Sequence, residues 1–576
     1  MWLPDTFSVN ISNIKRICNH MLTYTPPKSS TQITASKHSW LLMLLVFAWL
    51  WPGVFHHDLW TPGEPYLFET IRQWHSRQWA IPNLFHTINW DSSPLYIWLG
   101  ALCQYLLSPH WLDRYEATRF INAILMMLTF SCIGGSARQF LDRGNGRNAV
   151  LVLLGCPGLL MPGHFINDNI ILCLGAAMCW YGFSLSNRRV MMASLMLGGG
   201  WVVLSLSGSL LWPLLLMLLS ASLVLHPLWR YRRYYMVLAI SLLWAWPLIL
   251  IWPVALHQSS TAAFHQWWQY HALYPFGGFK HISIHFSLGY YLKNLIWFAF
   301  PAWPLAIWTA TRCQMKIHRW GILATSWLGL SAAIFATMPV QGQDLLVFIL
   351  PPLAVAGAAQ LNALRTGAVA FLNWFGIMSF GFLAIFLWLG FAAMNFGWPA
   401  KLAERATYFS PYYHYDIDYF PLIVASVLTP LWLWAITRQH IRGRQAITNW
   451  AAGILLVWSL LLTLFLPWLD AAKSARPVVI QMQNSLTSQL TQALESGKEC
   501  ISIRADSFST RIAWQEYSWI KLSPDNQHCR YRLVTHNLKI NAPENWVEIW
   551  AGARPREKNN VIALWQKVTK HTEQQP

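Results

Sequence analysis

The chain has 576 residues, of which 55% are hydrophobic and only 11% carry a charge. Soluble domains usually carry about 25% charged residues, so this composition excludes an ordinary soluble protein. Apolar runs of roughly twenty residues recur along the chain, which is the length a helix needs to cross about 30 Å of hydrocarbon. These runs are continuous rather than alternating, which predicts membrane-spanning helices and not a closed barrel.

The formal net charge of +18 would suit a nucleic-acid-binding protein. Much of the positive excess, however, lies in short connections between apolar runs, at residues 188–189, 230–233, 312–319 and 438–444. That distribution is typical of the cytoplasmic loops of membrane proteins, and no nucleic-acid-binding motif accompanies it. We therefore exclude nucleic acid as a partner and use these loops to orient the chain.

In chain order, residues 1–39 are predicted to be a cytoplasmic tail and residues 56–93 a first periplasmic loop. The loop charges then predict about thirteen spans. The spans are expected near 40–55, 117–137, 149–165, 168–186, 190–210, 211–226, 234–256, 290–310, 320–337, 345–363, 370–395, 419–437 and 449–468. The first loop and Asp168 are both expected on the periplasmic side, so an even number of spans must lie between them. The spans 117–137 and 149–165 supply that number, and the apolar segment 94–108 is therefore expected to be a juxtamembrane or re-entrant helix.

Residues 40–469 are thus predicted to form a transmembrane domain, and residues 470–576 a small periplasmic α/β domain. Two polar-region cysteines, Cys500 and Cys529, lie in the second of these domains. In an oxidising compartment they are expected to form a disulfide, and two free thiols are the alternative. The predicted fold class is an all-α polytopic membrane protein that carries this α/β domain at its end.

The first loop carries several charged residues beside the membrane, namely Asp58, Glu64, Glu69, Arg72, Arg77 and Asp91. They indicate either ordinary interfacial solvation or a polar site that faces a cavity. A structural role for Glu64 is specific, because Thr61 and Glu64 have the spacing of a capping box, with Pro65 just inside the helix that follows. A capping role and a functional role can coexist, and both stay open.

The same loop resembles a known family. Residues 60–66 read Trp-Thr-Pro-Gly-Glu-Pro-Tyr, and residues 94–99 read Pro-Leu-Tyr-Ile-Trp-Leu. This order is similar to the W-x-P-D-E-x-x-Y and P-L-Y-x-W-L stretches of the C-superfamily membrane glycosyltransferases, in particular bacterial lipid A aminoarabinose transferases and protein O-mannosyltransferases. Residues 164–169, 290–303 and 348–353 look like later family segments, so the resemblance covers about residues 40–365.

Three departures from the family pattern matter. The family usually has Asp-Glu where this chain has Gly63 and Glu64, and Tyr66 stands one position early. A lysine common before the P-L-Y run is replaced by Ser92 or Ser93. Either Glu64 or Asp58 has therefore taken over the acidic role, or the active site has degenerated.

The resemblance implies a transferase that moves a sugar from a polyprenyl-phosphate donor to a periplasmic lipid, glycan or protein. Such chemistry needs a base for the acceptor hydroxyl and cations for the leaving phosphate. We predict Glu64 as the base, Asp58 as its alternative, and Asp168 as a residue that orients the acceptor or the site. Asp168 as a helix N-cap is the structural alternative. The predicted phosphate ligands are Arg72, Arg77, Lys280 and Lys293, each of which suits contact with lipid headgroups equally well.

Two later loops are rich in aromatic residues and histidine. His271 and His285 belong to a loop whose histidines lack the tight spacing of a metal site, so an acceptor cleft is preferred to metal binding. Tyr412 and Tyr413 are assigned to the same cleft, together with Tyr66. No cofactor is predicted with certainty, and a requirement for a divalent metal is left open.

The sequence therefore predicts a multi-pass glycosyltransferase of the bacterial inner membrane, with undecaprenyl phosphate as the donor carrier and membrane lipids around it. A transporter or flippase for a lipid-linked substrate is one alternative, although no internal repeat supports it. A non-catalytic relative of the enzyme is the other, and the loss of the family Asp favours it. The sequence names neither the sugar nor the acceptor.

Overall fold

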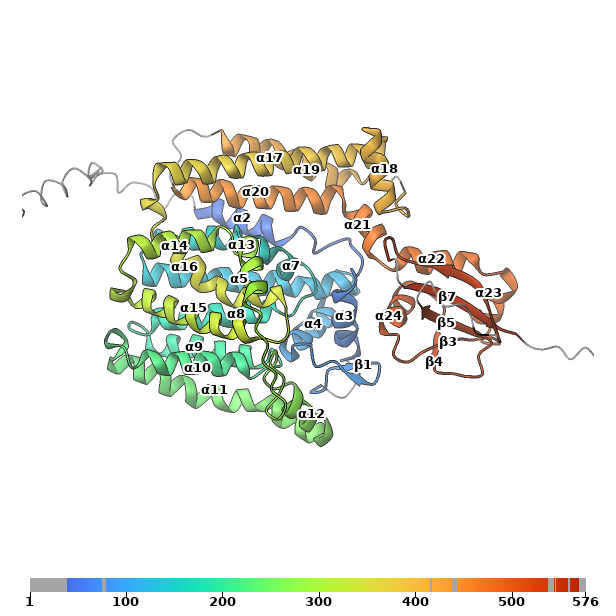
Figure 1. The fold of residues 1–576 in the computed structure, drawn as a ribbon, viewed down its shortest axis with the longest axis horizontal. Coiled ribbons are helices and arrows are strands. Elements are labelled where there is room, and N and C mark those ends of the chain that lie inside the picture. The colour runs from blue at the N-terminus through green and yellow to red at the C-terminus, as the bar shows by residue number, and fades with distance from the viewer. Residues whose placement is uncertain are drawn as a thin grey trace, which may run out of the picture. The chain divides into compact units, whose positions relative to one another are not determined.

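The computed structural model describes residues 39–74, 79–414, 417–437, 443–536, 543, 545–557 and 560–568. Residues from 45 onward form one unit, and every contact discussed below lies within it. Figure 1 shows a bundle of long helices followed in the chain by a small sheet with its own helices.

Among the described residues, six helices are long and apolar enough to cross a membrane. They are α5 (Arg114–Phe140), α11 (Arg232–Ser259), α15 (Arg319–Thr337), α17 (Thr366–Phe396), α19 (Tyr419–Ile436) and α20 (Gly443–Leu464). Shorter apolar helices accompany them: α2 (Ser39–Leu50), α4 (Pro94–Leu107), α8 (Ile170–Leu185), α9 (Val190–Ser205), α10 (Leu211–Leu223), and η4 (Gln343–Ile349) with α16 (Leu350–Ala359). Helices are expected here because a bilayer offers no water to satisfy backbone groups. The predicted polytopic all-α membrane fold is confirmed.

Two predicted spans are interrupted where proline removes a backbone donor. The span 290–310 divides into α13 (Leu288–Phe298) and α14 (Ala302–Arg312), with Pro301 at the break. The span 149–165 divides into α6 (Asn145–Leu154), the 3₁₀ turn η1 (Pro157–Leu159) and α7 (Leu160–His164). Proline ends a helix because it lacks an N–H group and its ring clashes with the preceding turn. These breaks leave non-helical backbone between the packed helices.

Helix α8, whose first turn follows Asp168, is held tightly by its neighbours α5 and α9. A methyl group placed on Gly182 of α8 would lie 2.7 Å from the backbone nitrogen of Leu197 on α9. Only glycine permits that approach of two backbones, which is the usual way that helices associate closely in a membrane. The C-terminal half of α8 is therefore packed closely against α9.

Short elements connect the spans. They are α3 (Gly63–Gln73), the hairpin β1 (Asn83–Leu84) and β2 (Thr87–Ile88), α12 (Thr261–Tyr270), α18 (Ala400–Phe409), and the 3₁₀ turns η2 (Pro227–Trp229), η3 (Met315–Ile317) and η5 (Leu361–Ala363). The predicted capping box at the start of α3 is wrong. Pro62 is the N-cap residue, and the Thr61 hydroxyl donates to the carbonyl oxygen of Lys473 instead of serving its own helix.

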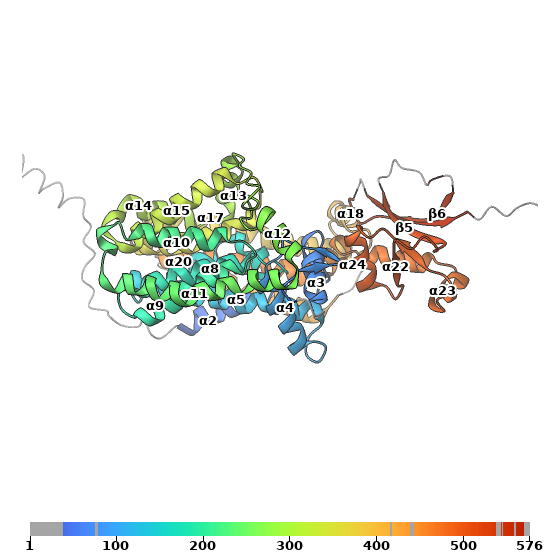
Figure 2. The same cartoon turned by 90° about the horizontal axis from the view of Figure 1, so that it is seen from below.

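The C-terminal part forms a five-stranded mixed sheet with helices on one side (Figure 2). Its elements are α21 (Leu466–Lys473), α22 (Arg476–Ser485), α23 (Ser488–Glu495), β3 (Ile501–Ile503), α24 (Phe508–Tyr517), β4 (Leu522–Pro524), β5 (Tyr531–His536), β6 (Trp546–Gly552) and β7 (Val561–Lys567). The strand order is β4-β3-β5-β7-β6, with β3 parallel to β4 and β5, and β7 antiparallel to β5 and β6. Trp514 of α24 is fully buried against Leu533 and Leu564 of the sheet. The predicted small α/β domain is confirmed.

Cys500 and Cys529 form a disulfide in this structure, across a sequence separation of 29 residues. They precede β3 and β5, which pair in parallel. Replacing either cysteine by serine should lower the free energy of unfolding of this domain by about 3 kcal/mol, because the unfolded chain regains the entropy of an open loop. Urea-dependent proteolysis of the full chain measures the effect. Cys313→Ser, at an unpaired cysteine, is the control, and equal stability of all three variants would contradict the prediction.

Candidate functional site

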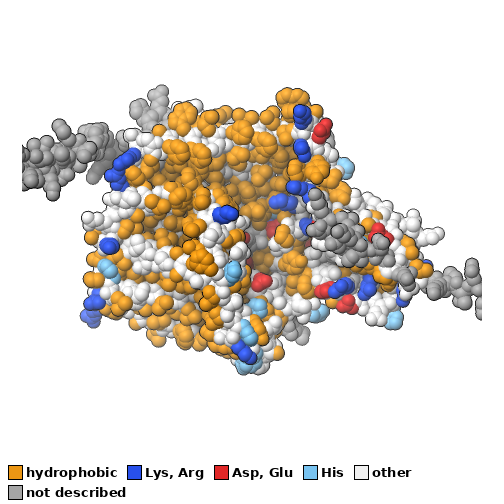
Figure 3. Space-filling model, viewed as in Figure 1, with side chains coloured by type: hydrophobic (Ala, Val, Ile, Leu, Met, Phe, Trp, Pro, Cys, Tyr) orange, Lys and Arg blue, Asp and Glu red, His pale blue; other side chains and the backbone are white. Residues whose placement is uncertain are grey.

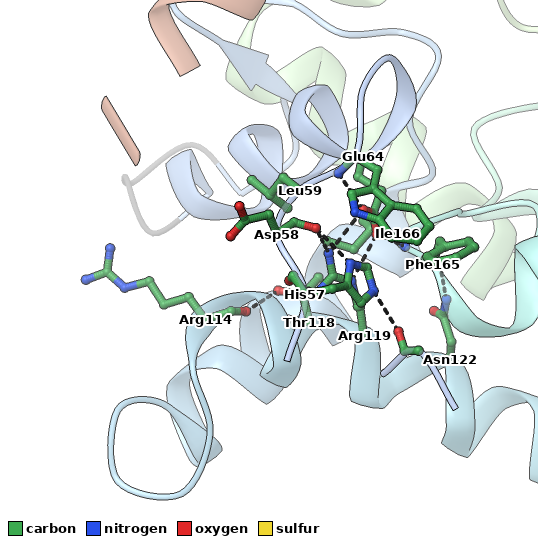
Figure 4. A network of polar contacts seen from close by, with 12 residues as sticks. His57, Asp58, Leu59, Glu64, Arg114, Thr118, Arg119, Asn122, Phe165 and Ile166 are labelled. Carbon is green, nitrogen blue, oxygen red and sulfur yellow. Dashed lines mark hydrogen bonds and ion pairs between the residues drawn. The ribbon is translucent and has the colours of Figure 1, made fainter. Parts of the chain in front are cut away.

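The centre of the first loop is a buried ion pair between Glu64 on α3 and Arg119 on α5 (Figure 4). Arg119 donates from Nε to Glu64 Oε1 and from Nη2 to Glu64 Oε2, both at 3.0 Å. The same guanidinium donates to the carbonyl oxygens of His57 and Asp58 at 2.8 Å. Arg119 thereby joins α5 to two points of the chain ahead of α3.

The Glu64 carboxylate accepts two further hydrogen bonds from backbone amides. The Trp60 amide donates to Oε2 at 2.8 Å, and the Ile166 amide donates to Oε1 at 2.9 Å. With the two bonds from Arg119, all four lone-pair positions of the carboxylate are occupied. Burial alone would raise the pKa of Glu64, but the charge and hydrogen bonds of Arg119 outweigh it, so that the pKa is lowered. This geometry argues against the predicted role of Glu64 as a base.

The segment between α7 and α8 is attached at two neighbouring backbone positions. Ile166 is held by Glu64, and the carbonyl oxygen of Phe165 accepts a hydrogen bond from the Asn122 amide of α5. Tyr96 of the P-L-Y run donates its hydroxyl to Asn122 Oδ1 at 2.7 Å. Figure 4 shows Asn122, Phe165, Ile166 and Glu64 meeting at this point.

Asp168 ends that segment, and its carboxylate is half-buried. Its Oδ2 accepts the backbone amide of Ser93, the N-cap residue of α4, at 2.7 Å. The predicted alternative, Asp168 as N-cap of its own helix, is wrong, because Asn169 occupies that position. Burial, helped by the nearby carboxylates Asp91 and Asp344 and opposed by the hydrogen bond from Ser93, raises the pKa of Asp168 to about 6.

A second carboxylate stands beside Asp168 at the start of η4. Asp344 Oδ2 accepts a hydrogen bond from the Asn167 side chain at 2.8 Å. Within the described residues, no group of three or more His, Cys, Asp or Glu side chains could hold a metal ion. Space-filling Figure 3 shows apolar side chains over the bundle and a hollow in this face where acidic side chains reach the surface.

An apolar cavity of about 350 Å³ lies among the helices α13, α14, α15 and α16. Its walls include Leu295 of α13, Ala306 of α14, Phe335 of α15 and Leu346 of η4. Leu346 follows Asp344 by two residues in η4, so an element that lines the cavity also carries one carboxylate of the acidic pair. The arrangement suits an amphiphile with a long apolar chain and a polar head.

The alternative base, Asp58, is paired with the C-terminal domain. Arg476 of α22 donates from Nε and Nη2 to its two carboxylate oxygens at 2.9 and 2.6 Å. Asp470 of α21 accepts the Asp58 amide and the Trp60 indole N–H through a single oxygen. Tyr517 of α24 accepts the amide of Leu59 at 3.0 Å. The first loop and the C-terminal domain therefore form one hydrogen-bonded network.

The predicted phosphate ligands are dispersed. Arg72 donates to both oxygens of the buried Glu69 at 2.7 Å and lies 3.6 Å from Glu516 of α24. Lys280 and Lys293 are exposed side chains, the second on a helix that lines the cavity. Arg77 lies outside the described residues. Among the described residues, no hydrogen bond or ion pair in this structure joins Arg72, Lys280 or Lys293 to Asp168.

The residues predicted for the acceptor cleft also lie apart. Tyr66 is half-buried on α3, His271 stacks on Trp90 at 5.5 Å, and His285 is exposed. Tyr412 donates to the Ala553 carbonyl oxygen in the C-terminal domain, and Tyr413 donates to Asn395. The cleft stays a prediction, and Tyr412 has a structural partner instead.

Sequence reasoning missed Arg119, Asn122, Asp344 and Asp470. The first two fall within the predicted span 117–137, where an arginine is costly unless it is paired or faces a cavity. That cost was the signal available for Arg119. The partner could not be read, because Glu64 lies 55 residues away in sequence.

Comparisons with known proteins bear on the fold. No protein-family model and no curated protein sequence matches the chain. The crystal structure of ArnT from Cupriavidus metallidurans bound to undecaprenyl phosphate is 13% identical, has a TM-score of 0.60, and is matched over 92% of this chain and 98% of that chain. The same protein in the apo state is 14% identical with a TM-score of 0.59, over 91% and 97%. The chain thus shares the fold of these ArnT structures.

Asp470 makes the contact between the first loop and α21 dependent on pH. Burial and, to a smaller extent, the Asp58 charge raise the pKa of Asp470 to about 7. The protonated form is favoured on folding, so this stabilisation is complete below the ordinary pKa near 4 and is lost as the pH rises through 7.

Asp470→Asn keeps an acceptor for Trp60 and never ionises. We predict that its unfolding temperature rises relative to that of the natural chain between pH 5 and pH 8. Intrinsic fluorescence in detergent across this range measures the difference, and parallel curves for the two proteins would contradict the assignment.

Proposed function

We propose that the chain is a membrane glycosyltransferase that takes its sugar from a polyprenyl-phosphate donor. The observation that carries the proposal is the apolar cavity lined in part by η4, the 3₁₀ helix that also carries Asp344 beside Asp168. A polyprenyl chain fits an apolar cavity within the membrane helices, and its sugar-phosphate would then lie beside a base. The neighbour ArnT is described as bound to undecaprenyl phosphate, and its fold likeness supports the same class of donor here.

Asp168 is the proposed base, in place of the predicted Glu64. A base works best when its pKa lies near the working pH, and Asp168 has a pKa of about 6 in a half-buried position. In the transfer, the acceptor oxygen bonds to the sugar anomeric carbon while the bond from that carbon to the phosphate oxygen breaks. The acceptor proton passes to Asp168, and polyprenyl phosphate leaves with the bonding electrons.

The cations for the leaving phosphate are proposed from the exposed lysines. Lys293 is the better candidate, because its helix α13 also lines the cavity through Leu292 and Leu295. The loop charges support an inner-membrane position with this site and the C-terminal domain on the periplasmic side. The acceptor is proposed only as a hydroxyl-bearing periplasmic lipid, glycan or protein.

A second candidate is a non-catalytic protein that binds the carrier lipid. Gly63 replaces the family Asp, and the two first-loop acids predicted as bases, Glu64 and Asp58, are both engaged by arginines. A Cβ atom at Gly63 would meet no atom within 4 Å, so packing does not require glycine there. The replacement of the family Asp by Gly63 therefore removes a carboxylate without a packing reason, and this supports the second candidate.

Asp168→Asn distinguishes the two candidates. The natural chain in nanodiscs should release free polyprenyl phosphate from a sugar donor in the presence of periplasmic acceptors, with a rate that falls about tenfold per pH unit below 6 as the base is protonated. The variant should lose about a hundredfold or more in kcat. Release that is equal in both proteins would contradict Asp168 as the base. Donor binding without release by the natural chain would favour the second candidate.

Filling the cavity tests the proposed site of the polyprenyl chain. Ala332 of α15 lines the cavity and is exposed, so Ala332→Trp adds bulk there without entering a packed core. We predict a rise of about tenfold or more in the Kd for undecaprenyl phosphate, equal to about 1.4 kcal/mol. Ala370→Trp, on the exposed face of α17, is the matched control. Equal Kd values for the two variants would show that the polyprenyl chain binds outside this cavity.

A further inference from the structure

Three features of the first-loop motifs converge on the short segment from Phe165 to Asp168. Glu64 of the W-x-P-x-E stretch accepts the Ile166 amide. Tyr96 of the P-L-Y run donates to Asn122, whose amide in turn donates to the Phe165 carbonyl oxygen. Ser93, which precedes that run, donates its amide to the Asp168 carboxylate. The three attachments come from α3, from α5 and from the N-cap of α4.

We infer that Glu64 and Asn122 are positioning residues that hold the segment 165–168 and so set the place of the Asp168 carboxylate. The inference rests on the proposed function, since it assigns these residues to the reaction only through Asp168. It gives the first-loop glutamate a role other than proton transfer.

Glu64 suits this role because each acceptor position of its carboxylate is occupied by a hydrogen bond. Its four hydrogen bonds arrive from a guanidinium and from two backbone amides, and its side chain is buried. Arg119 is itself fixed by the carbonyl oxygens of His57 and Asp58. A buried charge pair is tolerated only when its remaining donors and acceptors are satisfied. The pair therefore requires its hydrogen bonds to the first loop and to Ile166, which fixes the position of both.

Asn122 provides a second and independent attachment. Because the Tyr96 hydroxyl donates to its oxygen, its nitrogen faces Phe165, and the orientation of the amide is set. Both side chains are completely buried. Leucine at position 122 would keep the volume and remove these two bonds, together with the bond from Asn122 to the Pro162 carbonyl oxygen.

The consequence for transfer follows from geometry. Ile166 lies two residues before Asp168, so release of its amide lets the base shift relative to the donor. A displacement of about 1 Å at a reacting group costs on the order of a hundredfold in rate. The carboxylates that face Asp168, Asp91 and Asp344, would change distance as well, which would move the pH dependence of the reaction.

The test compares two variants with a matched control. Glu64→Met with Arg119→Met replaces the buried pair by apolar side chains of similar length, which avoids an unpaired buried charge. Asn122→Leu removes the second attachment. The control is Glu69→Met, which also removes a buried, ion-paired glutamate from α3, but one whose partners are Arg72 and Gln73 rather than the segment 165–168.

Two readouts are measured on the full chain in nanodiscs. Hydrogen exchange of the peptide that covers 164–169 should become at least about tenfold faster in both test variants and stay unchanged in the control. Transfer from a polyprenyl-phosphate sugar should lose about a hundredfold in kcat, keep its KM for the donor, and shift its acid limb from pH 6. A purely structural loss would lower the yield of folded protein in all three variants alike without moving the acid limb.

Unchanged exchange at 164–169 in both test variants would overturn the positioning role, whatever the activity. Faster exchange with unaltered kcat and acid limb would overturn it as well. Absence of transfer by the natural chain would instead overturn the proposed function, and the exchange data would still decide whether Glu64 and Asn122 hold the segment.

Discussion

The buried ion pair of Glu64 and Arg119 is the interaction on which the rest of the site depends. Removing two charges from water is costly, and the cost is offset only when attraction between them is joined by hydrogen bonds to every remaining donor and acceptor. Here those bonds come from Trp60 and Ile166 and go to two carbonyl oxygens of the first loop. The pair therefore connects the first loop, α5 and the segment between α7 and α8 that contains Ile166.

From this pair the network extends in two directions. Towards the bundle it reaches Ile166 and, two residues later, Asp168, an acid of raised pKa that lies near Asp344 of η4, and η4 also lines the apolar cavity. Towards the C-terminal domain it reaches Asp58, which Arg476 holds with two hydrogen bonds. The C-terminal domain thus contacts the same short stretch of loop that the ion pair stabilises. A membrane enzyme that uses a lipid-linked donor would need such rigidity, because one reactant is anchored in the bilayer.

Much of the fold could be predicted from the sequence, because continuous apolar runs and basic connections constrain helices in a bilayer strongly. The predicted roles of individual side chains failed where the side chain binds a residue far away in the sequence. Thr61 and Glu64 have the spacing of a capping box, yet Thr61 bonds Lys473 and Glu64 bonds Arg119. Asp58 is predicted from the sequence as the alternative base, but its carboxylate is bound by Arg476, 418 residues further on. Burial and ion pairing decide which carboxylate is available as a base, and neither can be predicted from the spacing of residues in the sequence.

The most direct test of this account is the structure of the protein in nanodiscs with undecaprenyl phosphate, determined by electron cryo-microscopy. The account predicts continuous density for the lipid chain along α13, α15 and α16, with the phosphate beside Asp168 and Asp344 and with the Glu64–Arg119 pair intact. Lipid density on another face of the bundle, or a phosphate remote from Asp168, would contradict it.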